Sequence, residues 1–198
     1  MKNKKMWIVL GALCAIALIV GLWLMSSYNG LVAKQVEVDK AWANVETVYQ
    51  RRSDLIPNLV NTVKGYAAHE SETLEAVTAA RTKATSMTID PSTATPEQME
   101  AWMAAQDGVT SALGRLIAIS ENYPDLKANQ NFLALQTQLE GTENRISVER
   151  SRFNEMVGEY NTQLRRFPTN IVASMFGFEQ RPMFEAQAGA EVAPVVEF

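Results

Sequence analysis

The chain has 198 residues, a length that suits one domain with an attached segment, and it carries a net charge of −4. Lys2, Lys4 and Lys5 precede a long apolar run, so residues 26–198 hold the other 15 basic side chains and all 22 acidic ones, a net charge of −7. This balance excludes nucleic-acid binding, which needs clustered cations along a groove. Because the single cysteine, Cys14, lies in the apolar run, the remaining residues contain no disulfide and no thiol nucleophile.

Residues 6–25 form an uncharged run of 20 residues, the length that crosses about 30 Å of hydrocarbon as a helix. The alternative is a secretory signal peptide, whose apolar core is usually about 7–15 residues. Since "LMSSYNG" is a poor cleavage site, we predict an uncleaved signal anchor that crosses the membrane once. The three lysines before the span favour a cytoplasmic N-terminus, which would place the bulk of the chain on the extracytoplasmic side.

The segment that follows the anchor shows one apolar face of an amphipathic helix. Its members are Leu31, Val38, Trp42, Val45 and Tyr49. Asp54 can cap a second helix, which places Pro57 in a first turn where its missing N–H breaks no hydrogen bond. Arg51 and Arg52 then fall in the last turn of the preceding helix, where cations complement the helix dipole. The pattern therefore predicts a joint between two helices at residues 51–57.

Two further apolar stripes predict two more helices, separated by a polar loop at residues 87–98. The first stripe consists of Ile56, Leu59, Val63, Tyr66, Leu74 and Val77. The second consists of Met99, Trp102, Gln106, Val109, Leu113 and Leu116. Thr95 and Gln98 have the spacing of a capping box with Pro96 at the first helical position, and Tyr123 should end that helix because Pro124 follows it.

The last segment is the most regular, with apolar residues seven apart from residue 132 to residue 167. They are Phe132, Leu139, Ile146, Phe153, Tyr160 and Phe167. A continuous helix from Asp125 to Phe167 would be about 60 Å long, a length typical of an elongated bundle or coiled-coil-like packing. Pro168 should end it.

These patterns predict an all-α protein, with an N-terminal transmembrane helix followed by an elongated antiparallel helical bundle. We divide the chain into a tail and anchor (1–27), a helical bundle (28–167), and a short helix with a loose tail (168–198). Several glycines lie inside the predicted helices, which suggests close helix crossings or misplaced helix ends.

Two groups of residues are candidates for a structural or partner-contact role. They are Arg51, Arg52, Asp54 and Pro57 at the predicted joint, and Glu143, Arg145, Glu149 and Arg150 midway along the long helix. Glu149 occupies a seam position, where a charge is costly unless it is paired. One interpretation is a polar layer or partner contact, and the other is a salt-bridge network that fixes the register of the bundle. We favour the second.

The chemistry-bearing residues predict no catalytic, cofactor or metal site. His69 lies near Glu70, Glu72 and Glu75, but these glutamates do not converge on one helical face and no second histidine accompanies them. The alternative function is a metal-dependent hydrolase that uses these acidic residues. A third interpretation, a receptor-like signalling stalk, lacks a visible sensory or output domain.

The segments "RRSDLIPNLV", "YPDLKANQNF", "TENRI" and "FPTNIVA" together resemble the LemA family, and the similarity covers nearly all of the chain after the anchor. The resemblance implies a bacterial single-pass protein of the inner membrane with an elongated bundle and no established enzyme activity. It also implies a membrane zinc metalloprotease as a possible partner. We therefore expect a membrane-anchored scaffold or adaptor that acts by self-assembly, as a homo-oligomer, and by partner binding.

Overall fold

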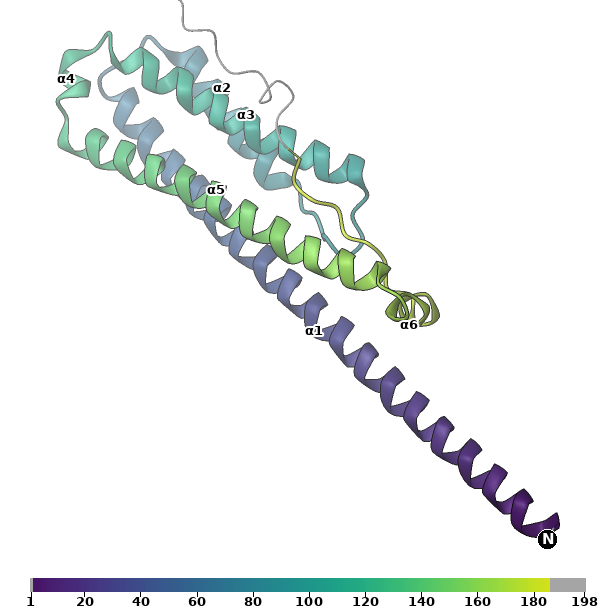
Figure 1. The fold of residues 1–198 in the computed structure, drawn as a ribbon. Helices are drawn as coiled ribbons and strands as arrows, with labels where there is room; N and C mark the ends of the chain where they lie inside the picture. Colours follow the sequence, from purple (N-terminus) through teal and green to yellow (C-terminus); the bar gives the residue numbers. More distant parts are fainter. Residues whose placement is uncertain (1, 186–198) are drawn as a thin grey trace, which may run out of the picture.

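The computed structural model describes residues 2–185, all of whose regular structure is helical (Figure 1). The helices are α1 (Lys2–Lys64), α2 (Ser71–Ser86), α3 (Pro96–Ser120), α4 (Pro124–Lys127), α5 (Gln130–Arg165) and α6 (Thr169–Phe176). The all-α prediction is confirmed. Residues 186–198, where a loose tail was expected, lie outside the described residues.

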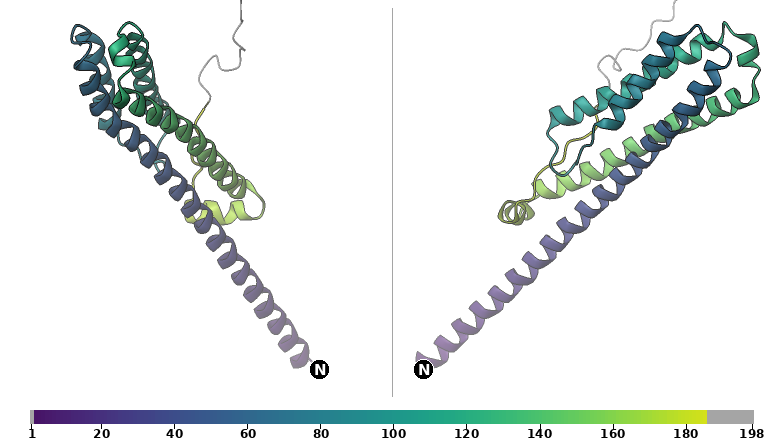
Figure 2. Two further views of the ribbon diagram at one scale, coloured as in Figure 1. Left: turned by 90° about the vertical axis from the view of Figure 1, so that its left-hand side faces the viewer. Right: turned by 180° about the vertical axis from the view of Figure 1, so that it is seen from behind.

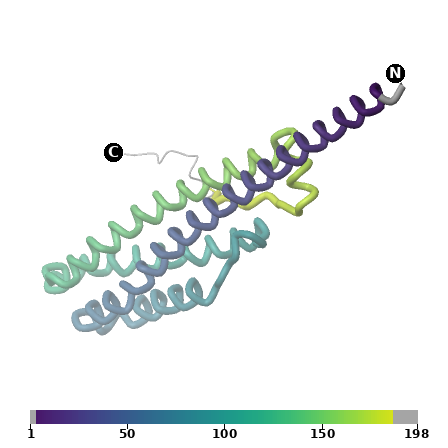
Figure 3. Tube along the Cα trace, turned by 90° about the horizontal axis from the view of Figure 1, so that it is seen from below, coloured from purple at the N-terminus to yellow at the C-terminus, as the bar shows by residue number. Residues whose placement is uncertain are grey.

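The long helices α1 and α5 run antiparallel and pack along each other (Figures 1 and 2). The shorter helices α2 and α3 pack as a second antiparallel pair, and α2 also contacts α1. The result is the elongated helical bundle that the spacing of apolar residues predicted. The N-terminal part of α1 projects alone beyond the rest of the molecule (Figure 3).

This projecting part of α1 is the predicted anchor. Within the described chain, α1 is the one helix that is long and apolar enough to cross a membrane. Its apolar side chains from Met6 to Leu22 are exposed, because no other part of the bundle covers them. Exposure of so many large apolar groups to water would be unfavourable, so lipid is the environment they suit.

The predicted joint at residues 51–57 is wrong, because α1 continues through Pro57 to Lys64 without a break. A proline inside a helix leaves the carbonyl four residues earlier without its usual donor. Here that carbonyl belongs to Ser53, and it accepts a hydrogen bond of 2.9 Å from Nε of Arg81 on α2. A donor from a neighbouring helix thus replaces the missing N–H, which removes the main reason for the helix to end. Asp54 is exposed within the helix and accepts a hydrogen bond from Gln50.

The boundaries around residue 125 also differ from the prediction. The helix α3 ends at Ser120, the single turn α4 follows, and α5 begins only at Gln130. Asn129 caps α5 by accepting a hydrogen bond of 3.0 Å from the backbone N–H of Phe132. At the other end α5 stops at Arg165, so the last member of the seven-residue series, Phe167, lies beyond the helix and is 77% exposed. The capping box at Thr95 and Gln98 is confirmed.

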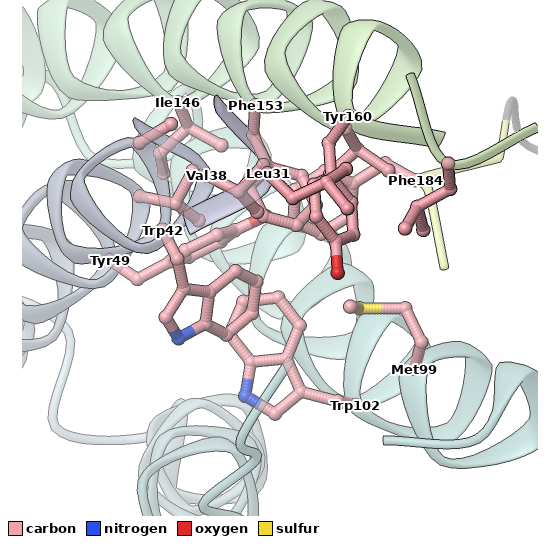
Figure 4. Packing of buried hydrophobic residues seen from close by; sticks show 14 of the residues in the cluster. Leu31, Val38, Trp42, Tyr49, Met99, Trp102, Ile146, Phe153, Tyr160 and Phe184 are labelled. Atoms are coloured by element: carbon pink, nitrogen blue, oxygen red, sulfur yellow. The ribbon is translucent and has the colours of Figure 1, made fainter. Parts of the chain in front are cut away.

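The buried residues fall into two clusters along the bundle. The membrane-proximal cluster is rich in aromatic side chains: Figure 4 shows Trp42, Trp102 and Phe153 converging from α1, α3 and α5. The ring centroid of Trp42 lies 5.3 Å from those of both Trp102 and Phe153. The distal cluster is built mainly from aliphatic residues and alanines of α1, α2, α3 and α5. All members of the stripe at residues 31–49 and of the stripe on α3 are buried, as predicted.

Candidate functional site

The boundary between the two clusters is occupied by a buried arginine, Arg52, which is only 2% exposed. Its Nη1 donates to Oε1 of Glu143 on α5 at 3.0 Å and to Oγ1 of Thr110 on α3 at 2.9 Å. Its Nη2 donates to the backbone and side-chain oxygens of Gln106 on α3, at 3.1 and 2.8 Å. We call Arg52, Gln106, Thr110 and Glu143 the polar layer. Through it a single guanidinium joins α1, α3 and α5.

The charge of Arg52 is stabilised by a carboxylate on one side and an aromatic ring on the other. The carboxylate is that of Glu143, whose side chain is 35% exposed, so solvent reaches part of the ion pair. The guanidinium also lies 5.0 Å from the ring centroid of Tyr49, a cation–π distance. Burial raises the pKa of Tyr49 above its ordinary value, although Arg150 and Arg52 oppose that shift. A tyrosine is neutral at physiological pH even without this shift, because its ordinary pKa is about 10.

A cleft of about 570 Å³ opens beside the polar layer, between α3 and α5. Its walls carry charges of both signs, and serine, threonine and apolar side chains lie among them. The cations are Arg52 and Arg150, and the carboxylates are Asp107, Glu143 and Glu185. The dimensions suit a side chain or a short stretch of polypeptide. The mixed charge favours a ligand that itself combines polar and apolar groups.

Phe184 lines the cleft and belongs to the segment 181–184, which we call the C-terminal strap. Asn161 and Asn154, seven residues apart on α5, each bind the main chain of the strap through both atoms of their amide. Asn161 accepts from the N–H of Arg181 and donates to its carbonyl, at 3.0 and 2.9 Å. Asn154 does the same for Phe184, with both distances at 2.8 Å. Paired contacts of this kind hold the strap extended against α5.

The side chains of the strap add specific contacts to this main-chain clamp. Phe184 is buried and lies 5.2 Å, centroid to centroid, from Phe153. Arg150 covers its outer face, with the guanidinium 4.9 Å from the ring centroid. At the other end, Arg181 is 5% exposed and pairs with Asp39 of α1 at 3.1 Å. The strap therefore completes the membrane-proximal core and forms part of the cleft wall.

The structure separates the other candidate residues. Of the two arginines before Pro57, Arg52 is buried in the polar layer and Arg51 is exposed. Arg145 is exposed on α5 and, among residues 2–185, forms no ion pair. Glu149 is half-buried, and its Oε2 atom is enclosed without a hydrogen-bond partner in the described part of the chain. Only Arg52 and Glu143 of the candidate set form an ion pair with each other.

His69 lies exposed in the turn between α1 and α2. The carboxylate of Glu70 accepts a hydrogen bond of 2.8 Å from the hydroxyl of Tyr123, so it ties this turn to the segment after α3. Glu72 and Glu75 are exposed on α2. Within residues 2–185 no group of three or more histidine, cysteine or acidic side chains is arranged to hold a metal ion.

Several site residues were missed at the sequence level. Gln106 could have been found, since it is a polar residue inside an otherwise apolar stripe. Thr110 gives no comparable signal. Asn154 and Asn161 leave a weaker signal, two asparagines spaced at seven next to the series that contains Phe153 and Tyr160. Arg81 leaves none, because nothing in the sequence connects it with the carbonyl of Ser53.

The fold and site define a membrane-anchored antiparallel helical bundle with a charged cleft at its side. The model of the LemA family matches residues 41–198, and the chain belongs to the LemA family. It is similar to the magnetosome proteins MamQ 1 and MamQ 2 of Paramagnetospirillum magneticum, each 26% identical over 95% of this chain and 74% of the relative. It is also similar to the protein LemA of Metamycoplasma hominis, 26% identical over 80% of this chain and 68% of that protein.

Proposed function

We propose that this protein is a membrane-anchored scaffold or adaptor, without catalytic activity, that binds a partner polypeptide in the cleft beside the polar layer. The observation that carries the proposal is the unbroken helix α1, which contains the anchor and also contributes Tyr49 and Arg52 to the cleft. A binding site on the same helix as the anchor has a fixed height above the membrane. Partners that are themselves in the membrane would meet it at high effective concentration.

The proposal includes self-assembly, as a homo-oligomer, and a membrane zinc metalloprotease as a candidate partner. It places the anchor in the bacterial inner membrane and the bundle on the extracytoplasmic side, which the three lysines before the span support. The alternative hydrolase gains no support from the contacts of His69 and Glu70. The buried polar groups at the cleft are occupied in joining helices, which is a structural task.

The experiment places a photo-cross-linking amino acid at Ser147 in the full-length chain, in the native membrane. Ser147 is exposed and lines the cleft, and its neighbour Val148 is exposed but does not line the cleft, so it is the matched control. We expect cross-linked partners at position 147 that are absent at position 148. Arg150→Glu should reduce the cross-link several-fold, and the same change at exposed Arg152 should not. Equal products at 147 and 148, or none at 147, would contradict the proposal.

A further inference from the structure

The short helix α6 leaves an apolar face uncovered at the membrane end of the bundle. We propose that α6 and Phe167 rest on the surface of the bilayer from which α1 emerges, so that the protein contacts the membrane at a second place besides its anchor. This inference depends on the anchor and is independent of the cleft and its partner.

The height of α6 relative to the membrane is set by Tyr28 of α1. The ring of Tyr28 lies 4.9 Å from that of Phe176 and 5.6 Å from that of Phe178, both in edge-on contact. Tyr28 is three residues beyond Met25, the end of the apolar span, a rise of about 5 Å along the helix. The polar headgroup layer is about 5–7 Å deep on each side of the hydrocarbon. Tyr28 and the end of α6 that touches it therefore lie at the level of the headgroups.

The orientation of α6 suits this position. In Figure 1 α6 is seen almost along its axis, whereas α1 and α5 extend across the page, and in the left view of Figure 2 α6 lies across α1. With α1 crossing the bilayer, a helix transverse to it lies close to the membrane plane. That is the arrangement of interfacial amphipathic helices.

The two faces of α6 differ sharply in burial. Thr169, Val172 and Ala173 are buried against the bundle. The opposite side exposes large apolar groups. These are Ile171 at 47% and Met175 at 66%. Phe167, which precedes the helix, is 77% exposed. Phe176 lies on the same side of the helix as Val172 and Ala173, where it contacts Tyr28 and is still 55% exposed. Because Ile171 and Met175 are four residues apart, they lie on one side of the helix. Large apolar groups left exposed on this short helix and on the residue before it indicate a contact with something apolar.

The charges nearby fit a phospholipid surface. Arg165 and Arg166 are exposed immediately before Phe167, where their guanidinium groups can reach lipid phosphates. Glu179, also exposed, is the acidic residue that follows α6, so the local balance is positive although the bundle as a whole is acidic. A protein partner could also cover an apolar face, but α1 already places this face beside lipid. The bilayer is therefore the occupant that the geometry favours.

The test measures which medium surrounds this face, in the full-length protein reconstituted in phospholipid vesicles. With Cys14→Ser removing the native thiol, a spin label is attached at Met175→Cys, and at Val148→Cys in the control. The two native side chains are matched in exposure, at 66% and 63%, but Val148 lies on α5 away from α6. Collision rates are measured with oxygen, which concentrates in lipid, and with a water-soluble nickel chelate.

We expect the ratio of oxygen to nickel collisions to be several-fold higher at position 175 than at position 148. Equal ratios at the two positions would overturn the proposal, because they would place α6 in water. Low collision rates with both reagents at position 175 would also overturn it, since they would indicate a protein contact. A failure here leaves the cross-linking result at Ser147 unaffected, so the two proposals can fail separately.

Discussion

The membrane-proximal and distal halves of the bundle are packed in different ways. The proximal half fills its interior with large rings from Trp42, Trp102 and Phe153, and it needs Phe184 of the C-terminal strap to complete the cluster. The distal half uses mainly small and aliphatic side chains, drawn from α1, α2, α3, α4 and α5. In the proximal half, built by α1, α3, α5 and α6, aromatic side chains and an added extended segment fill the remaining volume.

The polar layer lies where one kind of packing gives way to the other. On α1, Tyr49 belongs to the proximal cluster and Ile56 to the distal one, with Arg52 between them. The same change occurs on α5 between Ile146 and Leu139, on either side of Glu143. A buried charged group that joins three helices penalises any shift of one helix along another, because a shift would separate the ion pair. We propose that the layer fixes how the two halves align.

The largest effect is expected from removing a ring of the proximal core. Phe153 is fully buried, so Phe153→Ala should lower the free energy of unfolding by about 3–5 kcal/mol. Phe167→Ala, which belongs to the same seven-residue series but is exposed, should change it by no more than about 0.5 kcal/mol. Denaturant unfolding in detergent micelles measures both. Similar losses for the two variants would show that the proximal half is not packed as described.

A slightly smaller effect is expected at the boundary between the halves. Arg52→Met removes the donor that serves Glu143, Gln106 and Thr110 and should cost about 3 kcal/mol, the low end for a broken buried pair because solvent reaches Glu143. Arg51→Met, at an exposed position, is the control. Denaturant unfolding compares the two, and hydrogen exchange should show loss of protection on both sides of residue 52. A stable Arg52→Met variant would mean that the halves form one continuous core.

The smallest effect concerns the distal half, where Arg81 serves the carbonyl freed by Pro57. Arg81→Met should cost about 1 kcal/mol, the net value of one hydrogen bond. In a Pro57→Ala background the same change should cost nearly nothing, since the alanine N–H can bond to Ser53. A double-mutant cycle measures the difference between the two costs. Equal costs in both backgrounds would show that Arg81 acts through some other contact.

Much of the architecture could be predicted from periodicity, because apolar residues spaced three, four and seven positions apart indicate which face of a helix is buried. Errors arose where a contact from another helix decides the outcome. Local rules predict a helix start at Pro57, and they contain no information about Arg81 on α2, which donates to the carbonyl that Pro57 leaves free. Within the candidate site, Arg52 and Glu143 were identified, but their pairing with each other and with Gln106 depends on three helices meeting. The clamp formed by Asn154 and Asn161 was missed because its partners are main-chain atoms.

The continuity of α1 also fixes an angle. An α-helix turns by about 100° for each residue. In an unbroken helix, the direction that each side of the membrane span faces is therefore fixed relative to the direction that the cleft faces. One residue inserted between Ser26 and Ser27 would turn the cleft by about 100° around α1 relative to the membrane span. The lipid around the helix has no preferred direction in the membrane plane, so it would not sense this turn. The transmembrane helix of a partner, by contrast, lies on one particular side of the span. A partner that contacts both the span and the cleft must therefore fit the angle between the two around α1.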